Sequence, residues 1–134
     1  MTSKLDTFRN FVGPAQRQCL YDAMRGEEGE YFRKTIVAFM LATFETMPKT
    51  YEQDGKGEQA VVWLHYFSPS ADWYITERDM EEEQHQAFGL ADLFGDGGEL
   101  GYISIAELIA NGVELDLHWD PRPLVQCRKE RSAA

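Results

Sequence analysis

Three polar side chains near the C-terminal end have types and spacing that could bind a metal ion. His118 lies between Asp116 and Asp120 in "VELDLHWD", so a strand would place all three on one face. Imidazole and carboxylate groups are common ligands of divalent metals. A stable site needs further ligands, which no other part of the sequence indicates. These residues are therefore weak metal candidates, and we expect no cofactor.

Other polar clusters lack the order that a catalytic or ion-binding motif requires. The segment "DLFGDGGEL" has carboxylates around glycines but not the order of an EF-hand loop, so it predicts a tight hairpin turn. No serine lies in a GxSxG turn. Glu77 and Asp79 are interpreted as an exposed pair, and His65 as a packed, hydrogen-bonded histidine. No catalytic residue is predicted.

Charge is distributed unevenly along the 134 residues. The net charge is −10, yet residues 71–120 hold thirteen acidic side chains and one basic one, Arg78. Such a segment repels nucleic acid and anionic membranes and attracts basic proteins. An alternative is that the charge only keeps the domain soluble. The candidate partner-binding face comprises Glu77, Asp79, Glu81, Glu82, Glu83, Glu114, Asp116 and Asp120.

Two helices are predicted in the N-terminal part, about residues 4–48. Pro14 and Gly26 bracket a helix over about 14–25, and Pro48 ends a longer one that begins after Glu27. The apolar stripe of the longer helix indicates a core face: Phe32, Ile36, Phe39, Met40, Thr43, Phe44 and Met47.

The sequence of the α+β part, about residues 60–120, predicts a run of strands. Residues 60–77 predict a hairpin, whose aromatic residues Trp63, Tyr66, Phe67, Trp73 and Tyr74 are expected to pack in the core and across strands. Further strands are expected at 87–94, 99–104 and 113–120. Ser104 with Glu107 predicts the start of a short inserted helix that Asn111 and Gly112 end. The basic segment 121–134 is expected to be a loosely attached tail.

The predicted fold is one α+β domain with two N-terminal helices packed on a small, mainly antiparallel sheet. No apolar run approaches the roughly 20 residues of a membrane span, and the N-terminus lacks a secretory h-region. A cytoplasmic protein is expected, in which Cys19 and Cys127 stay free thiols.

Several motifs in order resemble one family. They are "LHYFSPSADWYITERD", "AFGLADLFGDGGELGYISIAEL" and "VELDLHW". The chain resembles an uncharacterised family of small domains encoded on plasmids, phages and other mobile elements. The resemblance implies mobile-element biology and carries over no catalytic residue.

The leading hypothesis is a non-enzymatic acidic protein that binds a basic partner, such as a nucleic-acid-binding host complex. A specific version is a DNA mimic that inhibits a host defence nuclease of the restriction or CRISPR type. The alternatives are a small enzyme or metal-dependent hydrolase that uses His118, Asp116 and Glu114 or Asp120, and a structural or assembly protein. In the last case, a homodimer would form through the aromatic hairpin or the long helix.

Overall fold

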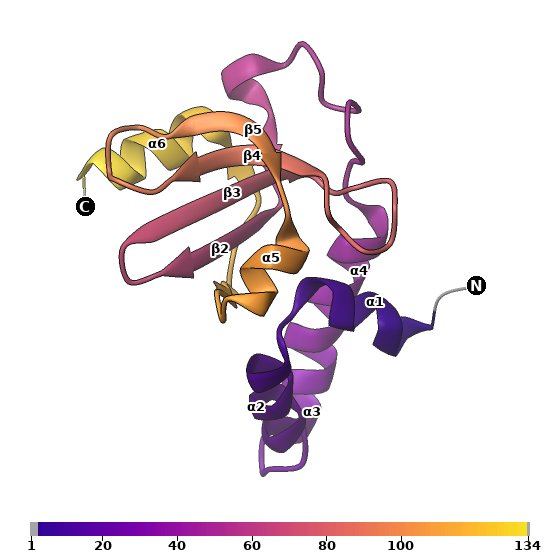
Figure 1. Cartoon of the computed structure of the whole chain (residues 1–134). Coiled ribbons are helices and arrows are strands. Elements are labelled where there is room, and N and C mark those ends of the chain that lie inside the picture. Colours follow the sequence, from indigo (N-terminus) through magenta and orange to yellow (C-terminus); the bar gives the residue numbers. More distant parts are fainter. Residues whose placement is uncertain (1–2, 134) are drawn as a thin grey trace.

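The N-terminal part of the computed structural model, which describes residues 3–133, is helical (Figure 1). α1 (Lys4–Phe11) begins after Ser3, whose hydroxyl accepts a hydrogen bond from the Asp6 backbone N–H at 3.1 Å. α2 (Pro14–Met24) follows. The third stretch runs without a break through α3 (Gly29–Tyr31), a π-helical segment η1 (Phe32–Val37) and α4 (Ala38–Thr46). Sequence patterns predicted the second and third helical stretches and missed α1.

The rest of the chain forms an antiparallel sheet with a short helix inserted before its last strand. The five-stranded sheet has the order β5-β4-β3-β2-β6, and β1 pairs separately with β7. These elements are η2 (Gly57–Gln59), β1 (Val61–Val62), β2 (Leu64–Ser68), β3 (Ala71–Glu77), β4 (Ala87–Asp92), β5 (Glu99–Ile103), α5 (Ile105–Ala110), β6 (Glu114–Leu115), β7 (Arg122–Pro123) and α6 (Leu124–Ala133). The predicted α+β class is confirmed.

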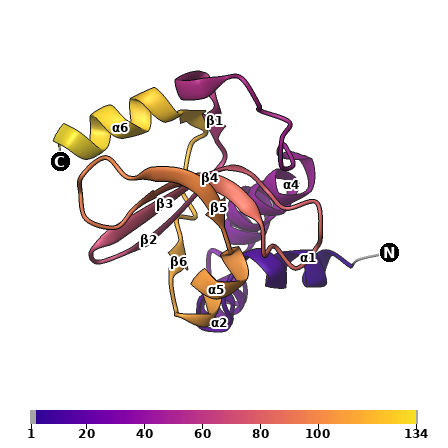
Figure 2. The same cartoon turned by 45° about the horizontal axis from the view of Figure 1, so that its top comes forward.

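Helices cover both faces of this sheet (Figures 1 and 2). On one face, Leu64, Tyr66 and Ile75 are buried in a core with side chains of α1, α4 and α5. On the other face, Tyr74 and Leu90 pack with Leu124 and Cys127 of α6 and with Trp119. Alternate residues of β3 therefore enter two different cores.

The expected tail is an integral part of the fold, so that prediction is wrong. Arg122 and Pro123 pair with β1, and α6 continues from them with Leu124 and Cys127 each 1% exposed. The sequence held a signal for this, because a proline directly precedes apolar residues spaced three apart, as at a helix start. Both cysteines are free thiols, as expected.

The expected strand over 113–120 is only partly correct. Glu114 and Leu115 form β6, after which the chain turns. The turn follows from the burial of Trp119, whose indole N–H donates to the Val62 carbonyl at 3.0 Å, away from the sheet edge. Leu115 and Trp119 are both buried as predicted, but in two different cores, so the common apolar face expected for 113–120 does not form.

Smaller departures concern where apolar residues lie. Phe39 is 47% exposed rather than part of the core, and β4 ends at Asp92, which leaves Leu93 and Phe94 exposed in the following turn. Five members of the predicted helical stripe are buried: Ile36, Met40, Thr43, Phe44 and Met47. Tyr66 and Tyr74 of the hairpin are buried as predicted, whereas Phe67 is exposed. Between residues 3 and 133, no helix combines the length and apolar character required to span a bilayer.

The sequence signals for the start and the end of helix α5 are confirmed. The Ser104 hydroxyl accepts a hydrogen bond from the Glu107 backbone N–H at 3.1 Å, which confirms the predicted helix start. Gly112 follows the helix with φ of 76°, a conformation that glycine adopts without strain.

The close approach of β3 and β4 requires glycine at position 89. A Cβ atom there would lie 2.0 Å from the Tyr74 carbonyl oxygen. At Gly101, its partner on β5, a Cβ would have no heavy atom of residues 3–133 within 4 Å other than those of the residue itself and its two chain neighbours. We expect Gly89→Ala to lower the free energy of unfolding by about 1–3 kcal/mol. Gly101→Ala should change it by less than about 0.5 kcal/mol. Urea titration of both variants checks this, and equal stabilities would contradict it.

Candidate functional site

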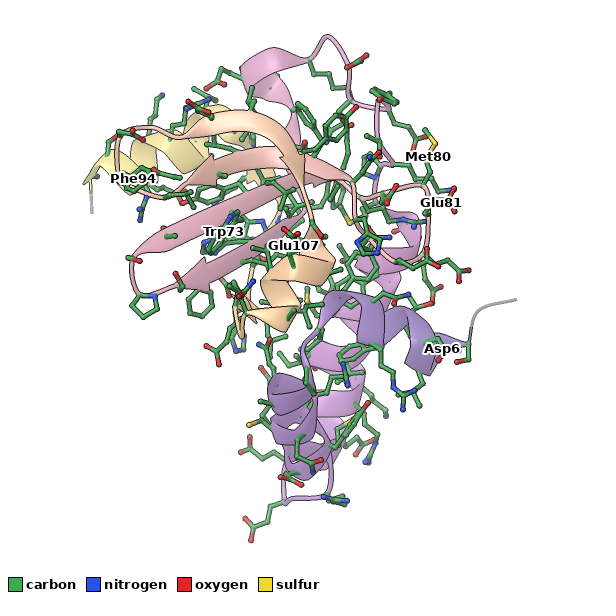
Figure 3. All side chains as sticks on the ribbon, viewed as in Figure 1. Asp6, Trp73, Met80, Glu81, Phe94 and Glu107 are labelled. Carbon is green, nitrogen blue, oxygen red and sulfur yellow. The ribbon has the colours of Figure 1, made fainter. Side chains whose placement is uncertain are left out.

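The acidic run lies in the loop between β3 and β4, which we call the acidic loop (residues 78–86). Figure 3 shows Met80 and Glu81 on this loop, far from Phe94 at the opposite end of the sheet. Met80, Glu81, Glu82 and Glu83 are exposed. The loop therefore presents consecutive glutamates to solvent, as the sequence predicted.

Glu77 and Asp79 do not belong to this exposed surface, so their interpretation as an exposed pair is wrong. Glu77 is 5% exposed and accepts backbone hydrogen bonds from Tyr51 at 2.5 Å and Gln53 at 3.1 Å. Asp79 is 7% exposed and accepts them from Glu81 at 3.2 Å and Gln86 at 3.1 Å. Both carboxylates satisfy backbone groups that would otherwise be left unpaired by burial.

Gln84 fixes the shape of the acidic loop from inside. Its side chain is fully buried; its oxygen accepts from the Asp79 N–H at 2.8 Å, and its amide nitrogen donates to the Glu81 carbonyl at 2.9 Å. The Gln84 carbonyl in turn accepts from Ile105 N–H at 3.0 Å, at the start of α5. The loop backbone is thereby tied to itself and to the helix.

A second polar cluster surrounds His65 on the opposite side of the sheet from α1. Its Nε2 lies 2.7 Å from Asp72 Oδ1 and its Nδ1 lies 3.2 Å from Asp116 Oδ2. The ring stacks on Tyr74, with centroids 4.9 Å apart, and also contacts Trp119. The prediction of a packed, hydrogen-bonded histidine is confirmed.

Arg131 of α6 extends this cluster into a network. It forms ion pairs with Asp72 and, through Nε at 3.0 Å, with Asp92, whose side chain is 2% exposed. Burial alone would raise the pKa of Asp92, but the hydrogen bonds from Arg131 and from the Gly95 N–H hold the pKa below its ordinary value. The Asp92 hydrogen bond correspondingly raises the pKa of Arg131.

A cavity of about 610 Å³ lies between α6 and the sheet. Its walls include Tyr74, Leu90, Arg128 and Arg131. The guanidinium groups are already paired, because Arg128 bonds Glu58 at 2.7 Å and Arg131 bonds the two aspartates. Burial raises the pKa of Tyr74 to about 12 and that of the Cys127 thiol to about 11, so neither is activated as a nucleophile. The cavity has the size of a ligand site without a reactive or uncompensated group.

The remaining predicted residues do not converge. Asp116 is committed to His65 and to the His118 backbone N–H, while Glu114, His118 and Asp120 are exposed. Because the expected strand ends at Leu115, the common face proposed for His118, Asp116 and Asp120 does not form. Within residues 3–133, no group of three or more His, Cys, Asp or Glu side chains is placed to hold a metal ion.

Sequence reasoning missed the most connected residues, which are Gln84, Arg131 and Asp72. Arg131 and Asp72 are partners on different elements, 59 residues apart, whereas the side chain of Gln84 bonds within its own loop and only its carbonyl reaches α5. No local spacing marks such pairs. The one available signal was the opposite charge of residues 71–120 and 121–134.

The fold defines an α+β protein in which the polar clusters form hydrogen bonds and ion pairs with other parts of the same chain. A family model matches residues 33–128, so the chain belongs to the family of proteins of unknown function designated DUF2958. The match includes the whole sheet and the acidic loop. Neither a curated protein nor a solved structure matches the chain significantly.

The contribution of Arg131 can be tested by Arg131→Met. Because Asp92 would stay buried without its cation, the free energy of unfolding at pH 7 should fall by about 1–3 kcal/mol. In the native protein the lowered pKa of Asp92 adds stability that is present above pH 3.8, its ordinary pKa, and is lost as pH falls through the lower folded value. This acid-induced loss should be smaller in the variant.

The matched control is Arg25→Met, since Arg25 pairs with Asp22 at an exposed position. It should cost less than about 1 kcal/mol. Urea unfolding at several pH values measures both variants. An Arg131 variant as stable as the control would show that the network adds nothing to stability.

Proposed function

We propose that the protein is a non-enzymatic interaction module that binds a basic protein partner through the acidic loop. The observation that carries the proposal is the exposure of Glu81, Glu82 and Glu83 on a loop whose backbone is hydrogen-bonded to the side chains of Asp79 and Gln84. Groups that are ordered before binding lose less conformational entropy when a complex forms. Their charge also speeds encounter with a cationic surface.

We further propose a narrower role as a DNA mimic of mobile-element origin, which acts in the cytoplasm on a defence nuclease of the restriction or CRISPR type. Carboxylates can occupy a basic channel where phosphates would bind. Two features support this role: the motif resemblance and the eight carboxylates of residues 71–120 that are exposed. These are Glu81, Glu82, Glu83, Asp96, Glu99, Glu107, Glu114 and Asp120.

The structure offers less support for a metal-dependent enzyme. The aspartates nearest to a histidine, Asp72 and Asp116, are both bonded to His65 and hold its ring in place between strands. They do not face a shared vacant position that a metal ion could occupy. Among residues 3–133, the titratable groups with clearly raised pKa values include the buried Tyr66, Tyr74 and Cys127, where burial is the main cause. Those shifts disfavour ionisation of the three groups.

The test begins with capture of partners from host lysate at low salt, identification by mass spectrometry, and purification of the captured protein. Calorimetry then compares the native chain with the triple variant Glu81→Gln, Glu82→Gln and Glu83→Gln. We expect at least about tenfold weaker binding by the variant. Binding of the native chain should also weaken between ~0.1 M and ~1 M salt, where the Debye length falls from about 10 to about 3 Å.

The matched control changes Glu27, Glu28 and Glu30 to Gln, which removes the same charge from exposed positions outside the loop. It should bind almost as the native chain does. If both triple variants lose the same affinity, net charge rather than the acidic loop determines binding.

A separate variant tests whether the shape of the loop matters. Gln84→Ala keeps every carboxylate but removes the hydrogen bonds to Asp79 and Glu81. We expect faster amide exchange in residues 78–86, about 1–3 kcal/mol lower stability and weaker partner binding. Unchanged affinity despite faster exchange would argue against a pre-ordered loop.

A further inference from the structure

The two edges of the five-stranded sheet differ in whether their outward backbone groups have hydrogen-bond partners. At the β6 edge, the side chain of Gln16 donates to the Leu115 carbonyl at 2.7 Å and accepts from the Leu115 N–H at 3.0 Å. This reciprocal pair replaces the hydrogen bonds that a neighbouring strand would make. The β6 edge is thus closed by the chain itself, as natural sheets commonly require.

The β5 edge has no comparable closure. It pairs only with β4, and among residues 3–133 no other strand or side chain is found hydrogen-bonded to its backbone. The strand "ELGYI" contains neither proline nor lysine, the residues that most often block edge pairing. Leu100 is 47% exposed and Tyr102 is 55% exposed, on the same face. Within residues 3–133, the β5 edge therefore has no backbone partner besides β4, although the Tyr102 hydroxyl is hydrogen-bonded to that of Tyr51.

We propose that the β5 edge pairs with β5 of a second copy of this chain, antiparallel and centred on Gly101. In this register Leu100 lies opposite Tyr102 of the second copy, and Glu99 lies opposite its Ile103. The two exposed apolar residues thereby form cross-strand pairs twice, and no like charges are directly opposed. The two sheets join into one continuous sheet.

The self-complementary register is the reason to choose a second copy over an unrelated strand. Glycine at the centre leaves room, since only Gly101 itself and its two chain neighbours, among residues 3–133, have heavy atoms within 4 Å of a Cβ at this position. The net charge of −10 on each copy opposes association, so salt should favour the dimer by screening. The proposed basic partner has the opposite salt dependence, which separates the two proposals experimentally.

Sedimentation equilibrium of the full chain at ~0.1 M and ~1 M salt measures self-association. We expect a dimer whose dissociation constant falls as salt rises and increases at least about tenfold in Leu100→Lys. Phe39→Lys is the matched control, because Phe39 is also 47% exposed but lies on α4; Phe67→Lys tests the hairpin. A monomer under all conditions, or a dimer lost in a control but not in Leu100→Lys, would overturn the proposal.

Disulfide trapping tests the register directly. In a Cys19→Ser background, Gly101→Cys should form a disulfide-linked dimer on mild oxidation, because directly paired antiparallel residues lie about 4.5–5.5 Å apart. Ala110→Cys, exposed on α5, should not. Equal cross-linking by both, or none at position 101 under conditions where the chain sediments as a dimer, would reject this pairing. The Glu81–Glu83 variant should dimerise at least as tightly as the native chain, because it carries less of the opposing charge, whichever way partner binding turns out.

Discussion

Burial of strand β3 on both of its faces is the constraint on which the rest of the structure depends. Ile75 is fully buried against the N-terminal helices, and the adjacent Tyr74 is 6% exposed beneath α6. A strand in this position exposes no side for solvent, so its polar residues must find partners within the protein. Asp72 and Glu77 meet this requirement with Arg131 and with backbone N–H groups.

The carboxylates of residues 71–120 consequently include buried or paired groups and exposed ones, which have different roles. Those on or next to β3 and β4 neutralise a cation or accept backbone hydrogen bonds, and they are consumed by folding. The exposed glutamates of the acidic loop, Glu81 to Glu83, lie between the buried Asp79 and Gln84, and Gln84 completes the internal hydrogen bonds without adding charge. An acidic sequence is thus a poor measure of acidic surface, because burial and pairing remove part of the charge before any partner is met.

Local sequence signals predicted the fold better than they predicted the polar clusters. Pro14, Ser104 and Gly112 act within one turn of chain, so their effects could be read directly. The aromatic hairpin was equally accessible because its two strands pair through a short turn from Ser68 to Ala71. Arg131 gave no such signal, since its partners Asp72 and Asp92 lie on distant strands. Gln84 bonds within its own loop, but no recognised motif marks a buried glutamine that accepts from and donates to the surrounding backbone. The C-terminal helix was a different failure, in which basic residues were taken as solvated although an apolar i, i+3 pair lay beside them.

The family model matches the two proposed interaction surfaces but not two of the residues that hold the sheet together. Residues 33–128 contain the acidic loop and the β5 edge, whereas Gln16 and Arg131 lie outside them. Gln16 closes the β6 edge and Arg131 holds α6 on the sheet. The flanking segments therefore complete hydrogen bonds and charge pairs that the matched segment leaves unfilled, yet neither reaches the β5 backbone. Closing one edge while leaving the other open gives strand addition a single site, and a chain with one open edge forms a closed pair rather than a continuing polymer.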